Sequence, residues 1–562
     1  MRRLMLALFV LCGTMVWAQE KKPAVSFEEK LLATIPEESV TRGIAFSPDG
    51  RRVAFASRDE HGSTWTVSIG DAAGEEFSDV EQLAFSPDGQ VLVYRGTDGG
   101  KFVVVQETKR GEMFDRMDPL AFAADGHSVV YGGRNPASGL WRVVVDDKAS
   151  EEFELLEFAG NTHVFLSSAG RPVACAGSAG GKQFVVVGTK RGEAFEQITA
   201  PIVSPDGSDV AYAARLEEKW VMVVRGQKGE PYDAVNSPVW SADGKVVAYG
   251  AKKGEHWRVV AGGVPGPEFD RVSDPVVSAD GSVVAYAAEK DKLWSVVRGG
   301  KAGETFDAAF GLTLSPDGAL VAYQAEKDGK RFVVAGETKG RAFEEIEPIS
   351  IGPDGKTVFY RAHKSGKLLL VVGDHTSQAC DVIDGPKFSR DGALWAYRGW
   401  SKRKWFLVVN GKKSDEVDEI RDFVLSADGK TVAYPVTLNG VAYVVAGDKK
   451  GPEWGDVGIP ALSPDGQTAA YQVWTAKEEV SVVTGDKKGE TFYETTPPAF
   501  SPDGRTVYYA GVKSGSRFVV IGDTRSGPFD EVWQPVFSPD GKKAAYGARS
   551  GRELWWKVVE VK

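Results

Sequence analysis

The feature that most constrains the fold is a repeat of about 37 residues. A Ser-Pro-Asp-Gly-like tetrapeptide recurs fourteen times in the 562 residues, and 37 residues separate its glycines in ten of the thirteen intervals. The remaining intervals are 39, 44 and 38 residues. A unit of this length cannot bury its apolar face alone and must pack on its neighbours. The sequence therefore predicts a repeat architecture. The glycines are Gly50, Gly89, Gly126, Gly170, Gly207, Gly244, Gly281, Gly318, Gly355, Gly392, Gly429, Gly466, Gly504 and Gly541.

An aromatic residue stands five positions after the glycine in thirteen of the fourteen units. It is Phe55 once and Tyr twelve times, from Tyr94 to Tyr546, and the exception is Cys175. We call this set the tyrosine column. A ring at one fixed position in each unit indicates that every unit uses it at the same place in its core.

Each unit reads as four short strands. Pro535 to Ser538 represents the first, and Val283 to Ala287 the second, after a turn in which Pro presets φ and Gly accepts a left-handed conformation. Apolar runs such as Trp141 to Val145 form the third, and short segments such as Glu268 to Val272 form the fourth. Strands rich in Val, Tyr, Trp and Phe, with frequent turn signals, predict an all-β protein. Four-stranded units of this length are typical of β-propellers.

Copies such as Phe500 to Tyr509, which read Phe-Ser-Pro-Asp-Gly-Arg-Thr-Val-Tyr-Tyr, resemble the PD40, or TolB-type WD40-like, propeller repeat. The resemblance covers residues 40 to 562. It implies the fold and says little about activity, because propellers host many unrelated functions. TolB itself would carry an α/β domain before its propeller, and here about 20 residues separate Gln19 from the first repeat.

Rings usually have four to eight blades, so fourteen units predict two tandem seven-bladed propellers, residues 19–299 and 300–562. The last unit ends after its third strand, and residues 27–35 resemble a spare fourth strand. We expect residues 27–35 to complete blade 7 beside Leu293–Val297, and Glu304–Ala308 to cross over to blade 14, which leaves no open edge. A single ring of fourteen would leave a wide hole and is disfavoured.

The N-terminus is typical of an export signal. A basic start at Arg2-Arg3 precedes an apolar run, and Val16-Trp17-Ala18 fits cleavage before Gln19. We therefore expect residues 1–18 to be a signal peptide and the protein to be periplasmic or extracellular. A lipoprotein anchored at Cys12 is the alternative. No stretch is long enough for a membrane span.

Composition argues against several function classes. A net charge of −10 disfavours nucleic-acid binding, which needs a basic face. Three Cys exclude a disulfide scaffold, and Cys175 and Cys380 read as small buried hydrophobes. The six His show no ligand spacing, and no Gly-x-Ser-x-Gly occurs. We expect no catalytic residue, no metal and no cofactor.

An acidic residue follows the aromatic of the fourth strand in most units. Such acids could line a channel and bind cations, but we expect them to cap backbone N–H groups where the chain passes to the next blade. They include Asp115, Glu196, Asp233, Asp270, Asp307, Glu344 and Asp530.

The candidate binding site is the most basic and aromatic loop between a second and a third strand. It contains Trp400, Lys402, Arg403 and Lys404, and Trp474 lies in the matching loop two units on. Aromatic residues beside Arg are typical of binding hot spots, although a solvated basic loop is the plain alternative. The sequence predicts an exported, non-enzymatic scaffold for a protein or peptide partner. The alternatives are a ligand-binding or hydrolytic propeller with a site at a channel mouth, and a cell-wall or polysaccharide binder.

Overall fold

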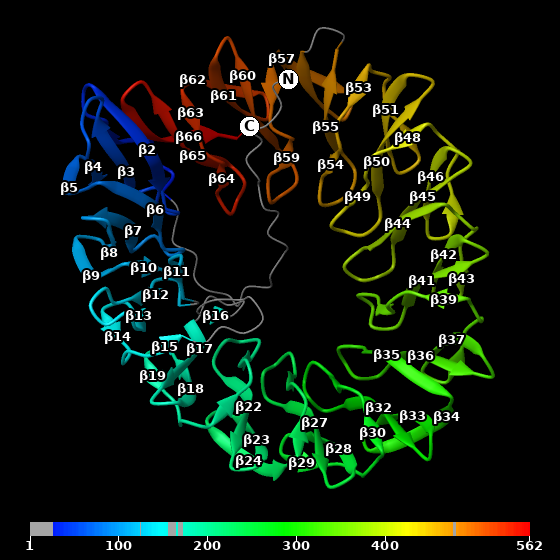
Figure 1. Cartoon of the computed structure of the whole chain (residues 1–562). Helices are drawn as coiled ribbons and strands as arrows, with labels where there is room; N and C mark the ends of the chain where they lie inside the picture. Colours follow the sequence, from blue (N-terminus) through cyan, green and yellow to red (C-terminus); the bar gives the residue numbers. More distant parts are fainter. Residues whose placement is uncertain (1–25, 124, 156–164, 167–171, 476–478, 562) are drawn as a thin grey trace.

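The computed structural model describes residues 26–123, 125–155, 165–166, 172–475 and 479–561. The predicted signal peptide, residues 1–18 with Cys12, lies outside these residues. The described residues form fourteen small antiparallel sheets and no helix. Figure 1 shows the sheets standing around a ring like the blades of a propeller. The predicted all-β class with fourteen four-stranded repeats is confirmed. Blades 1 to 14 span residues 39–77, 79–114, 116–149, 154–191, 197–232, 234–265, 271–306, 308–339, 345–376, 382–413, 419–450, 456–492, 494–529 and 531–560.

Blade 7 illustrates the common pattern. Two short innermost strands, β30 (Arg271–Val272) and β31 (Val276–Val277), both pair with β32 (Val284–Lys290). The sheet continues through β33 (Leu293–Arg298) to the outer strand β34 (Lys301–Phe306). Pro275 stands where the innermost strand is interrupted, because proline has no N–H to donate to the ladder.

The fourth strand begins earlier in the sequence than predicted. In blade 6 it is β29 (Val264–Pro265), and Phe269 forms an isolated bridge with Trp257. The predicted strand Glu268 to Val272 is therefore wrong, because Arg271 and Val272 already belong to blade 7. The chain passes to the next blade directly after the aromatic residue. The first strand likewise starts before the predicted Pro535, at β63 (Glu531–Val532).

The hydrophobic core is made of clusters between neighbouring blades. The same kind of cluster recurs at each junction between two blades. The aromatic residue of a fourth strand packs edge-on against the tyrosine-column ring of the following blade, with ring centroids about 6 Å apart. Such T-shaped contacts add to the burial of the rings themselves. The pairs are Phe77–Tyr94, Phe114–Tyr131, Phe195–Tyr212, Phe269–Tyr286, Phe306–Tyr323, Phe343–Tyr360, Phe492–Tyr509 and Phe529–Tyr546.

The ring closes between its first and last blades. The N-terminal strand β1 (Lys30–Thr34) pairs antiparallel with β66 (Glu553–Glu560) and becomes the fourth strand of blade 14. The prediction that residues 27–35 would complete blade 7 is therefore wrong. Ala33 and Ile35 are buried with Leu554 and with Val53 and Phe55 of blade 1, so blades 14 and 1 share one core cluster.

Blades 7 and 8 pack as neighbours in the same way. Strand β34 stays in blade 7, where Trp294 faces Phe306, so the predicted crossover of Glu304–Ala308 to blade 14 is also wrong. Phe306 contacts Tyr323 of blade 8 within one cluster. The boundary predicted after residue 299 falls inside the β33–β34 hairpin. The number of blades fits two tandem sets of seven. The contacts between blades, however, run from each blade to the next around one closed ring (Figure 1). A single ring is the arrangement that the sequence disfavoured.

The Ser-Pro-Asp-Gly turns are held by a repeated hydrogen-bond pattern. In blade 7 the Ser278 hydroxyl donates to Asp280 Oδ1 (2.7 Å) and accepts the N–H of Val283 (2.9 Å). The Ser282 N–H also donates to Asp280, and these hydrogen bonds lower the pKa of Asp280 to about 2. The turn thus satisfies the hydrogen-bonding groups of a buried serine hydroxyl and of a backbone N–H that would otherwise have no acceptor.

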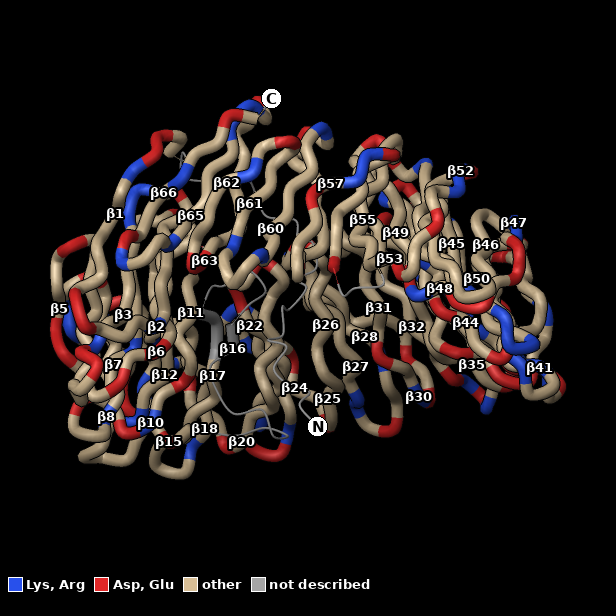
Figure 2. The backbone as a smooth tube through the Cα atoms, turned by 90° about the horizontal axis from the view of Figure 1, so that it is seen from above, with Lys and Arg blue, Asp and Glu red and all other residues tan. Residues whose placement is uncertain are grey.

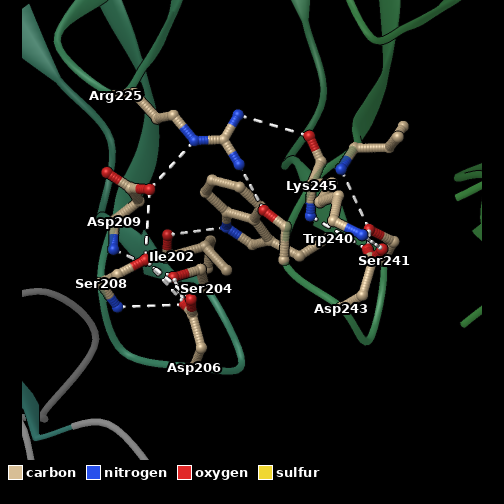
Figure 3. A network of polar contacts seen from close by, with 12 residues as sticks. Ile202, Ser204, Asp206, Ser208, Asp209, Arg225, Trp240, Ser241, Asp243 and Lys245 are labelled. Carbon is tan, nitrogen blue, oxygen red and sulfur yellow. Dashed lines mark hydrogen bonds and ion pairs between the residues drawn. The ribbon is translucent and has the colours of Figure 1, made fainter. Parts of the chain in front are cut away.

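Neighbouring turns are also tied to one another. Figure 3 shows Trp240 of blade 6 donating its indole N–H to the Ile202 carbonyl of blade 5 (3.0 Å). The Arg225 guanidinium lies over the Trp240 ring and donates to Asp209 of its own blade and to the Lys245 carbonyl of the next. These contacts tie blade 5 to blade 6.

The antiparallel order of strands gives the ring two faces. We call the face with the Ser-Pro-Asp-Gly turns and the connections from third to fourth strands the turn face. The face with the connections from second to third strands is the hairpin face. Figure 2 shows Lys and Arg interspersed with Asp and Glu on the side of the ring that it presents. In the described part of the chain, no helix is long and apolar enough to cross a membrane.

Candidate functional site

The predicted loop of blade 10 is a tight hairpin on the hairpin face. Trp400 lies near the end of β45 (Trp395–Ser401), and Lys404 opens β46 (Lys404–Val409). Lys402 and Arg403 form the turn with φ of 51° and 66°, so their side chains are exposed at its tip. Trp400 is half-buried and pairs with Trp405 across the hairpin. Lys402 and Arg403 are thus exposed, whereas Lys404 and Trp400 are half-buried.

Ion pairs between lysine and aspartate neutralise some of the cations on this face and leave others unpaired. Lys404 Nζ binds Asp418 Oδ1 (2.5 Å), which holds the pKa of that carboxyl below its usual range. In blade 9 the equivalent Lys367 pairs with Asp381. Across the part of the chain that the structure describes, Lys364, Lys402 and Arg403 form no ion pair. The neighbouring hairpins of blades 9 and 10 therefore present cations with no acidic residue in either turn.

Trp474 lies apart from this group. It ends β55 (Ala469–Trp474) in blade 12, so blade 11 separates it from Trp400. Its half-buried ring packs on the core cluster between blades 12 and 13, which contains Phe492 and Phe518. The structure does not bring Trp474 together with the blade 10 loop.

Five of the seven acidic residues named after the fourth-strand aromatic are backbone caps, as predicted. Each of the five accepts the N–H of a residue in the hairpin 21 positions later, which belongs to the blade that the acid opens. The bonds are Asp233 with Gly254 (2.7 Å), Asp270 with Asp291 (2.9 Å), Asp307 with Asp328 (2.8 Å), Glu344 with Ser365 (3.0 Å) and Asp530 with Gly551 (2.6 Å). Asp115 instead binds the Arg134 guanidinium.

Cys175 and Cys380 are buried free thiols, as predicted. Burial raises the pKa of Cys175 to about 12 and also raises that of Cys380, which disfavours the reactive thiolate form of both side chains. Within the described residues, no group of three or more His, Cys, Asp or Glu side chains could hold a metal ion.

A cavity between blades 10 and 11 was not predicted from the sequence. Its volume is about 600 Å³. Leu407, Val417, Val432 and Val436 supply apolar wall, and Tyr434 and Tyr443 line it with their rings. Lys412, Lys430, Asp415, Asp448 and Ser414 are among the polar residues that line it. Because these polar residues come from turns of the turn face, the cavity and the Trp400 hairpin lie on opposite faces.

The sequence carries one signal for this cavity. The position that faces the start of the third strand is aromatic in blades 1 to 8 and 11 to 13, but Cys380 in blade 9 and Val417 in blade 10. At the blade 9–10 junction Tyr397 and Phe406 are fully buried beside Cys380. At the blade 10–11 junction Tyr434 is only half-buried. The smaller residue leaves space only at the second junction.

No protein-family model matches the chain, and no curated protein matches it. A crystal structure of the eukaryotic initiation factor is 14% identical over 58% of this chain and 97% of its own, with a TM-score of 0.26. The dihydro-heme d1 dehydrogenase NirN in complex with DHE is 14% identical over 52% and 72%, with a TM-score of 0.23. Kuenenia stuttgartiensis hydrazine synthase is 15% identical over 45% and 95%, with a TM-score of 0.20. Similarity of this degree carries no inference, and the propeller assignment rests on the strand pairing.

Proposed function

We propose that the protein is an exported, non-enzymatic propeller scaffold of the PD40, or TolB-type, repeat class. It binds an acidic protein or peptide through the hairpin face of blades 9 and 10. The repeat sequence supports the class, and the basic and apolar start of the chain supports export. The protein partner is a proposal from the site alone.

The observation that carries this proposal is the group of cations at two adjacent hairpins. Lys364, Lys402 and Arg403 are exposed and lack ion pairs in the described residues, while the nearby Trp400 offers part of its ring. Some other hairpins of this face carry an acid beside their cations, as blade 7 does with Asp291 between Lys290 and Lys292. Unpaired cations around an aromatic ring favour an acidic surface, and complementary charge raises the rate of association.

The test is chemical crosslinking capture by residues 19–562 in extract of the exported compartment. The Lys402→Glu/Arg403→Glu variant should lose the partner that the natural sequence captures. The control is Lys290→Glu/Lys292→Glu, which makes the same change in charge on the same face at blade 7 and should retain the partner.

Salt gives a second measurement on the captured partner. Its affinity should fall as the salt concentration rises, because exposed charges are screened. Equal loss of the partner in both variants would contradict the assignment to blades 9 and 10. Failure to capture any partner would contradict the scaffold itself and would favour the ligand-binding or polysaccharide-binding alternatives.

A further inference from the structure

Tyr434 is the exception in the tyrosine column. Each of the other twelve members, from Phe55 to Tyr546, is less than 9% exposed, and most are less than 5% exposed. Tyr434 is half-buried and lines the cavity between blades 10 and 11. A phenol ring that is buried at the same position in eleven other blades is therefore open to a ligand here.

The cause is a change in the residues that normally cover this ring. Val417 replaces the aromatic residue whose ring meets the column tyrosine edge-on at eight other junctions. Val417 is itself buried, at 5% exposure, so its side chain stays in the position that the aromatic residue takes in other blades. The free space is therefore the volume of the phenyl ring that valine lacks. Tyr443 fills part of the space from the third strand of blade 11 and stays in the core cluster.

Ser414 also lines the cavity. Most other blades carry a glycine at its position, such as Gly451 in blade 11, where an added Cβ would lie 3.1 Å from the hydroxyl of the next column tyrosine, while Ser150 and Ser377 stand there in blades 3 and 9. The Ser414 hydroxyl instead accepts the Leu407 N–H (3.0 Å) and donates to the Asp415 carbonyl (2.9 Å). Its own hydrogen bonds are satisfied, so it forms part of a stable wall.

The cavity has apolar walls and a polar part. The walls are valine, leucine and tyrosine side chains, and the aromatic ring that packs against the column tyrosine at other junctions is missing. The polar residues carry both signs: Lys413 binds Glu416 (2.7 Å) and Lys450 binds Glu453 (2.8 Å), while Asp415 and Asp448 add carboxylates. Mixed charges and a hydroxyl suit a neutral polar chain, such as a peptide backbone, better than a strongly charged ligand.

We propose that this cavity is a binding site for a phenyl ring carried on a short neutral chain. The ring would occupy the space left by Val417 and contact Tyr434 edge-on, as the chain's own Phe residues do at other junctions. Its amide groups would meet the polar residues. A volume of about 600 Å³ is within the usual range for ligand sites and accommodates a ring with one residue of backbone.

The probe is N-acetyl-phenylalanine amide, and the readout is saturation-transfer NMR with residues 19–562. We expect saturable binding at millimolar concentration, and at least tenfold weaker binding of N-acetyl-leucine amide. Val417→Phe should abolish binding and raise the melting temperature, because the ring fills the cavity from within. Val417→Ile, which keeps the slot free of a ring, should bind as the natural sequence does.

Tyr434→Leu provides a second test if Val417→Phe does not fold, and it should weaken the phenylalanine probe at least tenfold. The site goes beyond the proposed function, since Lys402→Glu/Arg403→Glu should bind the probe unchanged. No saturable binding by the natural sequence, unchanged binding by Val417→Phe or by Tyr434→Leu, or equal binding of the leucine probe would each overturn the proposal.

Discussion

Replacing Phe306 by alanine tests whether blades 7 and 8 are joined like any other neighbours. Phe306 is 1% exposed, and its ring meets Tyr323 and Phe332 of blade 8 with centroids 6.0 Å and 6.1 Å away. Loss of a fully buried Phe ring costs about 3–5 kcal/mol, because a cavity remains where the ring was. That range includes about 0.5–1.5 kcal/mol for each lost aromatic pair. The expected loss of stability is therefore about 3–5 kcal/mol.

The matched control is Phe310→Ala, four residues later in the chain. Phe310 is 37% exposed and lies in β35 (Ala308–Leu314), where its ring is covered on one side by Arg331. The same chemical change should cost about 1 kcal/mol or less here, since little buried surface is lost. Urea unfolding gives the free energies, and hydrogen exchange of the β33 and β36 (Val321–Lys327) amides locates the loss. Equal and small effects of both variants would refute a packed junction between blades 7 and 8.

Three further predictions concern pH and the contacts between turns. The pKa of Asp243 and of Asp280 is about 2, against an ordinary value of 3.8. Their contribution to stability is therefore complete above about pH 4 and is lost as the pH falls towards 2. An unfolding free energy that does not change between pH 5 and pH 2 would contradict this. Burial raises the pKa of Tyr212 and of Tyr286 to about 12, against an ordinary value of 10.0. Their contribution to stability is therefore complete below pH 10 and is lost as the pH rises towards 12. Tyrosinate absorbance should rise together with unfolding, whereas titration near pH 10 in the folded state would show that the rings are exposed. Arg225→Ala should cost about 1 kcal/mol by removing the cation over Trp240 and the hydrogen bonds to blade 6. Its control Lys228→Ala, which removes an exposed pair with Glu193, should cost about 0.3 kcal/mol in the same urea titration, and equal costs would contradict the role of Arg225.

The repeat itself could be predicted because its signals are local. The Pro-Asp-Gly turn, the tyrosine five residues later and apolar runs such as Trp141–Val145 each specify a short stretch of chain, and all three recur. The buried cysteines and the capping acids follow from the same register. Such features need no knowledge of which blade lies next to which.

Closure of the ring could not be predicted in this way. Strand β1 reads Lys-Leu-Leu-Ala-Thr and lacks the aromatic residue and glycine that mark other fourth strands, so its partner is not specified by the repeat. Pairing with β33 or with β66 would satisfy the same backbone groups. The uninterrupted 37-residue spacing across blades 7 and 8 was the available signal, because it leaves no linker between separate rings.

The cavity between blades 10 and 11 was missed for a different reason. Val417 reads as an ordinary β-branched core residue, and only alignment of the blades shows that it replaces an aromatic ring. The same substitution type at Cys380 leaves the neighbouring tyrosine buried. The outcome at each junction depends on how the surrounding side chains pack, which the sequence pattern does not specify.

The measurement that tests the single closed circuit most directly is disulfide trapping of β1. Thr34 and Glu553 are exposed cross-strand neighbours, so Thr34→Cys/Glu553→Cys should form an intramolecular disulfide under mild oxidation, read by peptide mass spectrometry. Thr34→Cys/Leu293→Cys places the second cysteine on β33 of blade 7 and should not crosslink within one chain. A disulfide in the second variant and none in the first would contradict the account and restore two separately closed rings.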